Sequence, residues 1–579
     1  MRPMPDPATV LSERLEAAIT AAFGPDLAGT DPVLRRSDHA DFQANVAMAL
    51  GKRLGHKPRD IAARIVEHLD ASDIIEPPTI AGPGFINLQF RSSYLGHALE
   101  AEALDPRLGV PEVTNGGPTM VEYSAPNVAK EMHVGHLRSS VIGDALARTL
   151  TFAGYPVLRQ NHLGDWGTQF GMLIEHLVDL GWAEPGHDHT IADLNALYQG
   201  AQTKFAADDD FKTRARERVV ALQSGDGTTL ALWQELTDES KRHFERVYTK
   251  LGVLLTAADI RGESFYNDEL AATVAELEAK GLVTLNDGAL CAFPSGFSNR
   301  DGEPLPLIVR KRDGGYGYAS TDLAAIRFRT QVLGLARLVY VVDARQSQHF
   351  AMVFAIAEQA GWMVDARAEH VAFGTVLGRD GKPFKTRSGE TVKLVDLLDE
   401  GIERAAAFVA DKGPDLDPET RARVARAVGI GAIKYADLAS DRVKDYVFDW
   451  DRLLAMDGNT APYLQYAHAR IRSILRRAAA EGFGPGPIHI EAPQERALAL
   501  ALVGFSETVV QVVDTLQPHR LCTYLFDLAS SFSGFYEHCP VLRADTEQQR
   551  ASRIALADLT ARVIAQGLDL LGIEAPEQM

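Results

Sequence analysis

The stretch that most constrains the fold is Val121–Asp144, which reads VEYSAPNVAKEMHVGHLRSSVIGD. A short β-type run at residues 119–123 feeds a Pro-Asn turn, and a polar segment then leads into a helical pattern with one apolar face. A strand that ends in a glycine-containing turn at a helix start is where an open α/β sheet binds anions. The stretch therefore predicts a parallel α/β sheet with a ligand site at this strand end.

Two histidines flank a glycine at the start of the expected helix. His133 and His136 lie three residues apart, so they share a helix face and can reach one ligand together. Gly135 removes a side chain where a flat ring or a phosphate would approach the backbone. An HxGH pattern alone is weak evidence for a site, and its position directly after a strand is what favours one.

The 579-residue chain is long enough for three or four domains of ordinary size. No run of about 18 apolar residues indicates a membrane span, and the first ten residues lack the apolar core of a signal peptide. Cys291, Cys522 and Cys539 have no paired or CxxC spacing, which fits a reducing cytoplasm and provides no zinc knuckle. The net charge of −19 argues against unselective binding to nucleic acid, DNA included, but allows a local basic surface for a structured RNA.

The chain divides into segments with different patterns. Residues 1–108 carry three amphipathic helical patterns, at residues 9–23, 41–54 and 59–69, and one alternating strand at residues 84–90, which predicts a small α+β domain. In residues 109–405, strands at 119–123, 157–161, 338–342 and 371–376 alternate with helices, which predicts a doubly wound parallel sheet of the Rossmann-like class. A polar insertion at about 185–300, with helices at 210–222 and 229–251, splits that sheet.

Strand signals stop after residue 405. Residues 406–458 form a connecting helical segment, and residues 459–579 predict an all-α bundle with helices at 463–477, 495–516, 520–538 and 552–571. The first of these combines Tyr463 and Tyr466 with four arginines. Aromatic and arginine side chains together suit unstacked RNA bases and phosphates. A basic solvated helix face with two core tyrosines explains the same pattern equally well.

Several separate segments resemble one family. HVGH at residues 133–136 looks like the HIGH signature of class I aminoacyl-tRNA synthetases, and residues 122–139 and 159–173 are similar to the arginyl versions of their regions. GKPFKTRSGETVKLVDLLDE, at residues 381–400, resembles that family's form of the KMSKS loop, and APYLQYAHARI, at residues 461–471, resembles the start of its anticodon-binding bundle. The resemblance to arginyl-tRNA synthetases runs from about residue 41 to the C-terminus.

This resemblance implies an ATP-dependent ligase. Such an enzyme activates L-arginine with ATP to arginyl-adenylate and transfers arginine to tRNA-Arg, with Mg²⁺ accompanying ATP and no dedicated protein metal site. It also implies a cytoplasmic monomer, with a D-loop-contacting N-terminal domain. By resemblance, the residues that hold ATP or assist catalysis are Lys130, His133, Gly135, His136, Lys385, Thr386 and Arg387.

One departure from the family pattern changes the weight of these residues. Residues 383–387 read PFKTR, so the usual second lysine of KMSKS is Thr386. In arginyl enzymes the lysine before the HIGH-like motif is thought to compensate, and that lysine is Lys130 here. Lys130 is therefore the expected main cation at the α-phosphate, with Lys385 and Arg387 offsetting charge on the pyrophosphate.

The resemblance also implies an arginine pocket. Guanidinium is a planar fork of donors, so its recognition needs carboxylates and a hydroxyl. Glu122, Tyr318 and Asp322 are the expected partners of the guanidinium, and Asn127 and Gln346 are those of the α-amino and carboxylate groups. The alternatives left open are an ion pair of Glu122 with a neighbouring arginine and a helix-capping role for Asp322. Such a pocket rejects amino acids without a matching donor fork, so no large editing domain is needed.

For tRNA, the expected contacts are Phe42 and Gln43 at the D-loop corner and Tyr463 and Tyr466 on anticodon-loop bases. Two other functions remain to be weighed. Another class I synthetase, or an HxGH nucleotidyltransferase, is disfavoured by the missing zinc motif, the modest insert and the C-terminal bundle. A non-catalytic RNA-binding paralogue would have lost ligands such as His133 or Asp322, and these are present.

Overall fold

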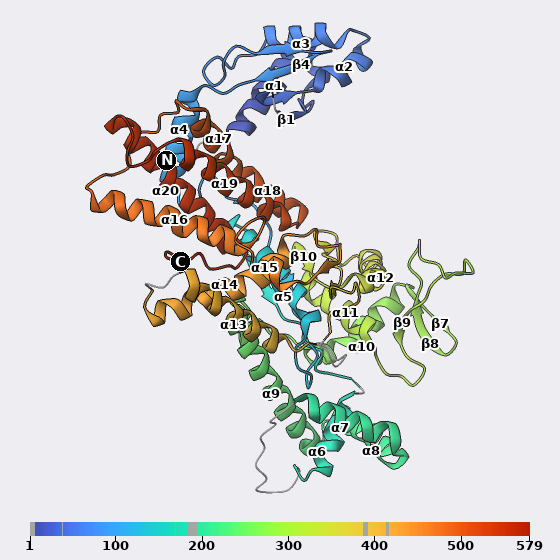
Figure 1. The fold of residues 1–579 in the computed structure, drawn as a ribbon. Helices are drawn as coiled ribbons and strands as arrows, with labels where there is room; N and C mark the ends of the chain where they lie inside the picture. The colour runs from blue at the N-terminus through green and yellow to red at the C-terminus, as the bar shows by residue number, and fades with distance from the viewer. Residues whose placement is uncertain (1–5, 38, 168, 183–193, 386–391, 413–415) are drawn as a thin grey trace.

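The computed structural model describes residues 6–37, 39–167, 169–182, 194–385, 392–412 and 416–579. The molecule is elongated, with the N-terminal α+β domain at one end and the helices of the insertion at the other (Figure 1). The helical bundle and the central sheet lie between them.

The N-terminal domain packs helices against a four-stranded antiparallel sheet of order β1-β2-β4-β3. Its elements are α1 (Pro7–Phe23), β1 (Leu34–Ser37), β2 (Ala40–Ala44), α2 (Val46–Leu54), α3 (Pro58–Glu67), β3 (Thr79–Ala81), β4 (Phe85–Leu88) and α4 (Ser92–Leu104). The single helix expected at residues 41–54 is wrong at its start. Phe42 and Ala44 alternate into the core as strand residues do, so residues 40–44 pair in the sheet and the helix begins at Val46.

The central sheet consists of four parallel strands in the order β11-β10-β5-β6, as the alternating pattern predicts. They are β5 (Thr119–Glu122), β6 (Val157–Gln160), β10 (Arg337–Tyr340) and β11 (Arg367–His370). The strand expected at 371–376 is displaced, because the ladder ends at the pair Tyr340–His370. The chain then leaves the sheet, and β12 (Val376–Leu377) pairs with β13 (Tyr446–Val447) instead.

The connection between the two halves of the sheet carries two units. The first is helical and contains α6 (Gln169–Asp179), α7 (Leu194–Ala207), α8 (Asp209–Gln223) and α9 (Gly227–Leu251), which includes both helices expected from the sequence. The second, not anticipated, is a three-stranded antiparallel sheet of β7 (Val283–Asn286), β8 (Ala289–Ala292) and β9 (Leu307–Arg310), flanked by α10 (Asn267–Ala279) and α11 (Tyr318–Arg327). Helix α12 (Ser347–Gln359) then joins β10 to β11.

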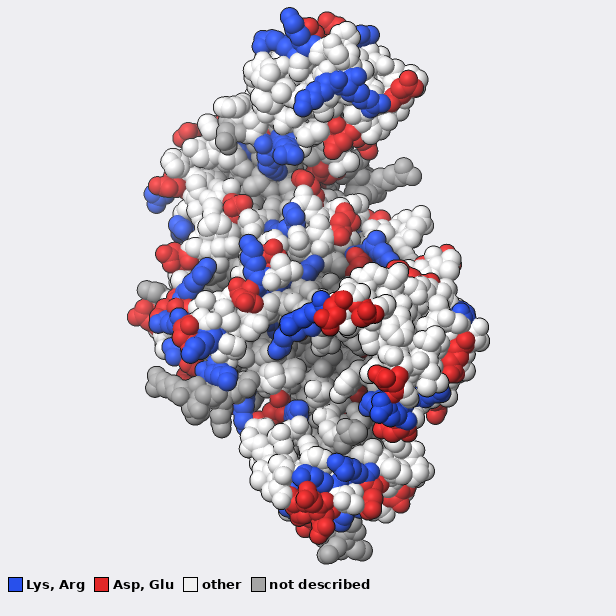
Figure 2. Space-filling view, turned by 90° about the vertical axis from the view of Figure 1, so that its right-hand side faces the viewer, with Lys and Arg blue, Asp and Glu red and all other residues white. Residues whose placement is uncertain are grey.

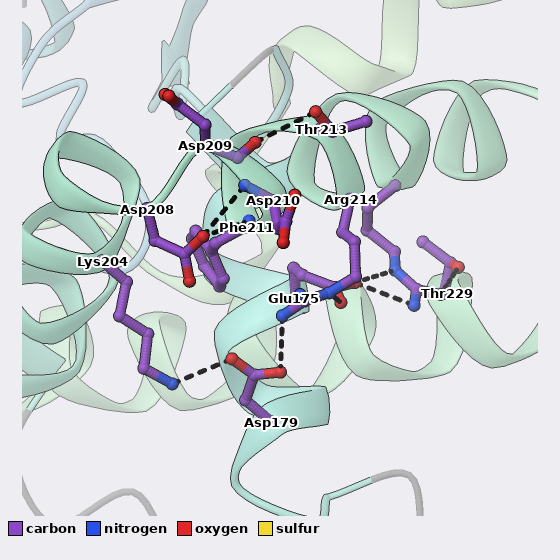
Figure 3. A network of polar contacts seen from close by, with 11 residues as sticks. Glu175, Asp179, Lys204, Asp208, Asp209, Asp210, Phe211, Thr213, Arg214 and Thr229 are labelled. Atoms are coloured by element: carbon purple, nitrogen blue, oxygen red, sulfur yellow. Dashed lines mark hydrogen bonds and ion pairs between the residues drawn. The ribbon is translucent and has the colours of Figure 1, made fainter.

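A network of ion pairs fastens the helical unit of the insertion together (Figure 3). Glu175 of α6 accepts from Arg214 of α8 at 2.8 Å and from Arg218 at 3.0 Å. Asp179 of α6 accepts from the same Arg214 and from Lys204 of α7, each at 2.9 Å. Because the Glu175 side chain is only 5% exposed, two arginines around it satisfy a carboxylate that burial would otherwise penalise.

The C-terminal region is helical, as expected. Its helices are α13 (Leu394–Lys412), α14 (Pro418–Leu438), α15 (Trp450–Leu453), α16 (Ala461–Ala480), α17 (Pro493–Leu502), α18 (Gly504–Thr515), α19 (His519–His538) and α20 (Glu547–Leu570). The helix expected at 495–516 is two helices. By length and composition, residues 493–515 could span a membrane, because an 18-residue window there has a mean hydropathy of 1.6. However, α17 and α18 pack against α19, and 56% of that window is buried, as is typical of bundle-core helices.

Candidate active site

The loop after β5 is held in an unusual backbone conformation. Ser124, Ala125 and Ala129 have positive φ angles of 71°, 46° and 63°, which side chains other than glycine rarely adopt. The backbone N–H of Ser124 donates to Ser139 Oγ at 2.9 Å, and that of Ala129 donates to Ser240 Oγ at 2.9 Å. Side chains from α5 (Val134–Phe152) and α9 thus fix the loop that carries Lys130.

The two histidines cap the N-terminus of α5. Nδ1 of His133 accepts the N–H of Gly135 at 3.0 Å, and Nδ1 of His136 accepts the N–H of His133 at 3.1 Å. The ring centroids are 4.1 Å apart. Since each Nδ1 is an acceptor, a neutral ring carries its proton on Nε2 and can donate it to a ligand.

The electrostatic surroundings keep both rings neutral. Burial, with the charge of the neighbouring His133, lowers the pKa of His136 to about 3. Burial, and secondarily the ammonium of Lys130, lowers the pKa of His133. At neutral pH the pair is therefore a set of neutral N–H donors at a helix N-terminus, an arrangement that suits an anionic ligand.

Gly135 has a second reason to be glycine. A Cβ at this position would lie 2.7 Å from Cε1 of His133, so any side chain would displace the capping ring. The sequence suggested only the approach of a ligand to the backbone. The structure adds that the glycine is needed for the geometry of the histidine pair.

Lys130 is half-buried, and its Nζ lies 4.3 Å from the ring centroid of Tyr198 on α7. The adjacent Glu131 pairs with Lys393 at 2.7 Å. In the part of the chain that the structure describes, no carboxylate pairs with Lys130. Among those residues, the charge of Lys130 is therefore not neutralised by an ion pair.

Both ends of the KMSKS-like loop are anchored, one to β12 and the other to the HVGH segment. At one end, Phe384 donates its N–H to Val376 O at 3.0 Å, and its ring lies 4.9 Å from that of Phe448. At the other end, Val134 donates to Val392 O at 3.0 Å and Leu394 to Met132 O at 2.9 Å. Lys385 is exposed, whereas Thr386 and Arg387 lie outside the described residues.

Glu122 is engaged within the protein. Its side chain is 6% exposed, and Oε2 accepts from Nη2 of Arg329 at 2.5 Å. Nη1 of the same arginine donates to the hydroxyl of Tyr340 at 2.9 Å. Of the two interpretations of Glu122, the ion pair with a neighbouring arginine is the one that the structure shows.

The other expected arginine ligands lie on three separate segments. Tyr318 begins α11 and is 74% exposed, and Asp322 lies one turn further along. Oδ2 of Asp322 is 2.6 Å from Nε2 of His349 on α12. Asp322 does not cap α11, because the N-cap is Gly317. Asn127 after β5 and Gln346 before α12 are both exposed.

Glu263 was missed by the sequence analysis. It begins a 3₁₀ turn, Glu263–Tyr266, that Asp165 holds through the N–H of Ser264 at 2.8 Å. Burial raises the pKa of Glu263 to about 8, and the charges of Asp322 and Asp165 add to the effect. These carboxylates form an acidic cluster that a bound cation would stabilise. No motif marks Glu263 in the sequence, since it lies in the polar insertion.

Comparison with known proteins identifies the family of the chain. Residues 104–450 match the family model described as tRNA synthetases class I (R), catalytic domain, residues 464–579 match the DALR anticodon binding domain, and residues 9–90 match the arginyl tRNA synthetase N terminal domain. The arginine–tRNA ligase of Thermobifida fusca is 57% identical, with all of both chains covered. The chain belongs to the arginyl-tRNA synthetase family.

Further relatives agree over the whole length. The arginine–tRNA ligase of Frankia casuarinae is 52% identical over 98% of this chain and 99% of its own. The crystal structure of arginyl-tRNA synthetase from Plasmodium falciparum superposes with a TM-score of 0.86 at 28% identity, covering 100% of each chain. That of the Thermus thermophilus enzyme gives 0.80 at 28% identity, covering 99% of this chain and 100% of its own. The architecture of this synthetase, with N-terminal, class I catalytic and DALR domains, is therefore as expected.

The expected tRNA contacts of the synthetase differ in exposure. Phe42 is 5% exposed and packs edge-to-face on Phe90 at 5.7 Å, so its ring lies in the core and is not available to RNA. Gln43 donates to Asn87 at 2.8 Å. Tyr466 is 44% exposed, whereas Tyr463 is half-buried with its ring 5.7 Å from Phe526.

Two of the arginines on the same helix are also engaged. Arg472 pairs with Glu577 at 2.7 Å, and Arg476 lies 3.8 Å from the same carboxylate. On the face shown in Figure 2, basic and acidic side chains are interspersed along the molecule rather than separated into large areas of one sign. A net negative synthetase can therefore still present local basic groups to RNA.

Proposed function

We propose that this synthetase activates L-arginine with ATP and transfers the arginine to the 3′ end of tRNA-Arg. The observation that carries the proposal is a set of neutral histidine donors and a lysine in the segment after β5, together with an acidic cluster of Glu263, Asp165 and Asp322. The first two suit the phosphates of ATP, and the third suits a guanidinium.

In the first step, an oxygen of the arginine carboxylate attacks the α-phosphorus of ATP. The bond from that phosphorus to the bridging oxygen breaks, and pyrophosphate leaves with the electron pair. Nε2–H groups of His133 and His136 hold the nucleotide, and Lys130 offsets charge on the α-phosphate as it is transferred. From the loop, Lys385, Thr386 and Arg387 would contact the pyrophosphate.

Mg²⁺ would arrive as the complex with ATP, held mainly by phosphate oxygens. Within the described residues, no group of three or more His, Cys, Asp or Glu side chains could hold a metal ion. The chain's own part is therefore to position the phosphates with Lys130 and the histidine pair.

For arginine, Asp322 and Glu263 would accept hydrogen bonds from the guanidinium, with Tyr318 at the rim. His349 fixes the Asp322 carboxylate at 2.6 Å, so its orientation is set before arginine binds. Asn127 and Gln346 would hold the α-amino and carboxylate groups. Glu122 would support the pocket indirectly, through its ion pair with Arg329, which also bonds Tyr340. Arginine would contact Glu122 directly only by displacing Arg329.

For tRNA, Tyr466 and Tyr463 would stack on anticodon-loop bases, and the N-terminal domain, through polar groups such as Gln43, would contact the D-loop corner. In the second step the terminal ribose hydroxyl attacks the arginyl carbonyl carbon and AMP leaves.

The same proposal includes domain boundaries at residues 108, 405 and 458, a monomeric state and a cytoplasmic location. Light scattering of the purified protein tests the monomer.

The test is ATP–pyrophosphate exchange with each of the twenty amino acids in the presence of tRNA-Arg. We expect exchange with L-arginine, and clear exchange with a different amino acid only would contradict the proposal. Asp322→Ala should abolish arginine use while tRNA binding stays intact. Full aminoacylation by that variant would overturn the pocket assignment.

A further inference from the structure

The contact that holds Lys130 comes from outside the sheet. Its ammonium lies 4.3 Å from the ring centroid of Tyr198, which belongs to α7 of the insertion. The nearby carboxylate of Glu131 is directed to Lys393 instead, at 2.7 Å. In the ranges that the structure describes, the ammonium of Lys130 has no hydrogen bond or ion pair. Its electrostatic partner there is the face of the Tyr198 ring.

An aromatic ring suits this task better than a carboxylate. The quadrupole of the ring attracts an ammonium to its face without neutralising it. A carboxylate in the same place would compete with a phosphate for the same charge. A lysine side chain also loses considerable rotamer entropy when it is fixed, and a preformed contact removes that cost before the substrate binds.

The ring is itself held by the insertion rather than by the lysine. Leu194, Leu197 and Ala201 on α7 are buried, and Tyr198 packs against the main core. Lys204 of the same helix pairs with Asp179 at 2.9 Å, within the network that joins α6, α7 and α8 (Figure 3). The insertion therefore presents Tyr198 to the strand-end loop from a braced position.

We propose that Tyr198 is a positioning residue for adenylate formation, which holds the ammonium of Lys130 at the reacting phosphates so that the helical insertion completes the active site. This inference rests on the proposed role of Lys130. It assigns the insertion a part in the first chemical step.

The experiment measures arginine-dependent pyrophosphate exchange and single-turnover adenylate formation, with MgATP and tRNA-Arg present. Tyr198→Leu should lower kcat by about 3- to 30-fold, the range of a partly desolvated cation–π contact, with the KM for arginine unchanged. Tyr198→Phe keeps the ring and should retain most of the rate. Phe205→Leu, which removes a ring from the same helix seven residues away, controls for loss of packing and should stay close to the parent rate.

A double-mutant cycle with Lys130→Ala separates the inference from its premise. If Tyr198 acts through Lys130, removing the ring from the Lys130→Ala variant should cost nothing further. A slow Lys130→Ala with a fully active Tyr198→Leu would overturn the role of Tyr198 and leave that of Lys130 intact. A fully active Lys130→Ala would overturn both. Additive losses, or a Phe variant as slow as the Leu variant, would show that the ring does not act on the ammonium.

Discussion

The acidic cluster predicts that arginine use depends on pH through the ionisation of one residue, Glu263. The pKa of Glu263 is raised to about 8, chiefly by burial and then by the charges of Asp322 and Asp165. A guanidinium pairs with the ionised carboxylate, so the free synthetase must lose this proton before arginine binds productively. The value of kcat/KM for arginine should therefore increase as the pH rises towards 8.

The magnitude follows from the pKa. With a pKa of about 8, roughly a tenth of Glu263 is ionised at pH 7 and half at pH 8. The value of kcat/KM for arginine should rise about five-fold over that unit and level off above pH 9. The two histidines at the start of α5 do not contribute over this unit, because burial lowers the pKa of His133 and that of His136.

The assay is the kcat/KM for arginine in pyrophosphate exchange between pH 6 and 9.5, with saturating MgATP and tRNA-Arg. Glu263→Gln should lower kcat/KM and remove the rise. Two groups elsewhere, Glu102 and Lys434, also have a pKa near 8, and the Gln variant distinguishes their effects from that of the pocket. A rise that persists in Glu263→Gln, or a flat profile in the parent, would refute the reasoning.

Four other substitutions test separate features. His136→Ala should lower kcat about 100- to 1,000-fold, as loss of one preorganised donor does. The loss should be the same at pH 6 and pH 9, because the ring is neutral at both, and kinetics at the two pH values check this. Asp437→Asn leaves Arg138 buried opposite a neutral group, where the ion pair measures 3.1 Å, and should cost about 3–5 kcal/mol in urea unfolding; an unchanged midpoint would contradict it. Phe42→Ala should destabilise the N-terminal domain by about 3–5 kcal/mol, because the ring is buried. Tyr466→Ala should leave the melting temperature unchanged and raise the KM for tRNA about 5- to 150-fold, because the ring is exposed. The reverse pattern would contradict the core position of Phe42 and the tRNA contact of Tyr466.

Periodicity located most of the elements. The helices at 9–23, 210–222 and 229–251 were found within a few residues, because apolar spacing records which face is buried. It failed where a strand and a helix share one apolar run, as at residues 40–54, and where the ladder ended before the hydrophobic run did, as at residues 367–376. In both places pairing with a distant strand, rather than local preference, decides the boundary.

The sequence by itself determined the strand-to-helix unit that carries Lys130, His133 and His136, because those residues are neighbours along the chain. Only the tertiary structure decided that Glu122 is paired with Arg329, that Phe42 is buried, and that Glu263 joins Asp322. It likewise brought Tyr198 to Lys130. The three pairs join residues from 59 to 207 positions apart, and Phe42 packs on Phe90, 48 positions further along the chain. Burial and charge at such sites are set by whatever the fold packs against them, which local sequence does not record.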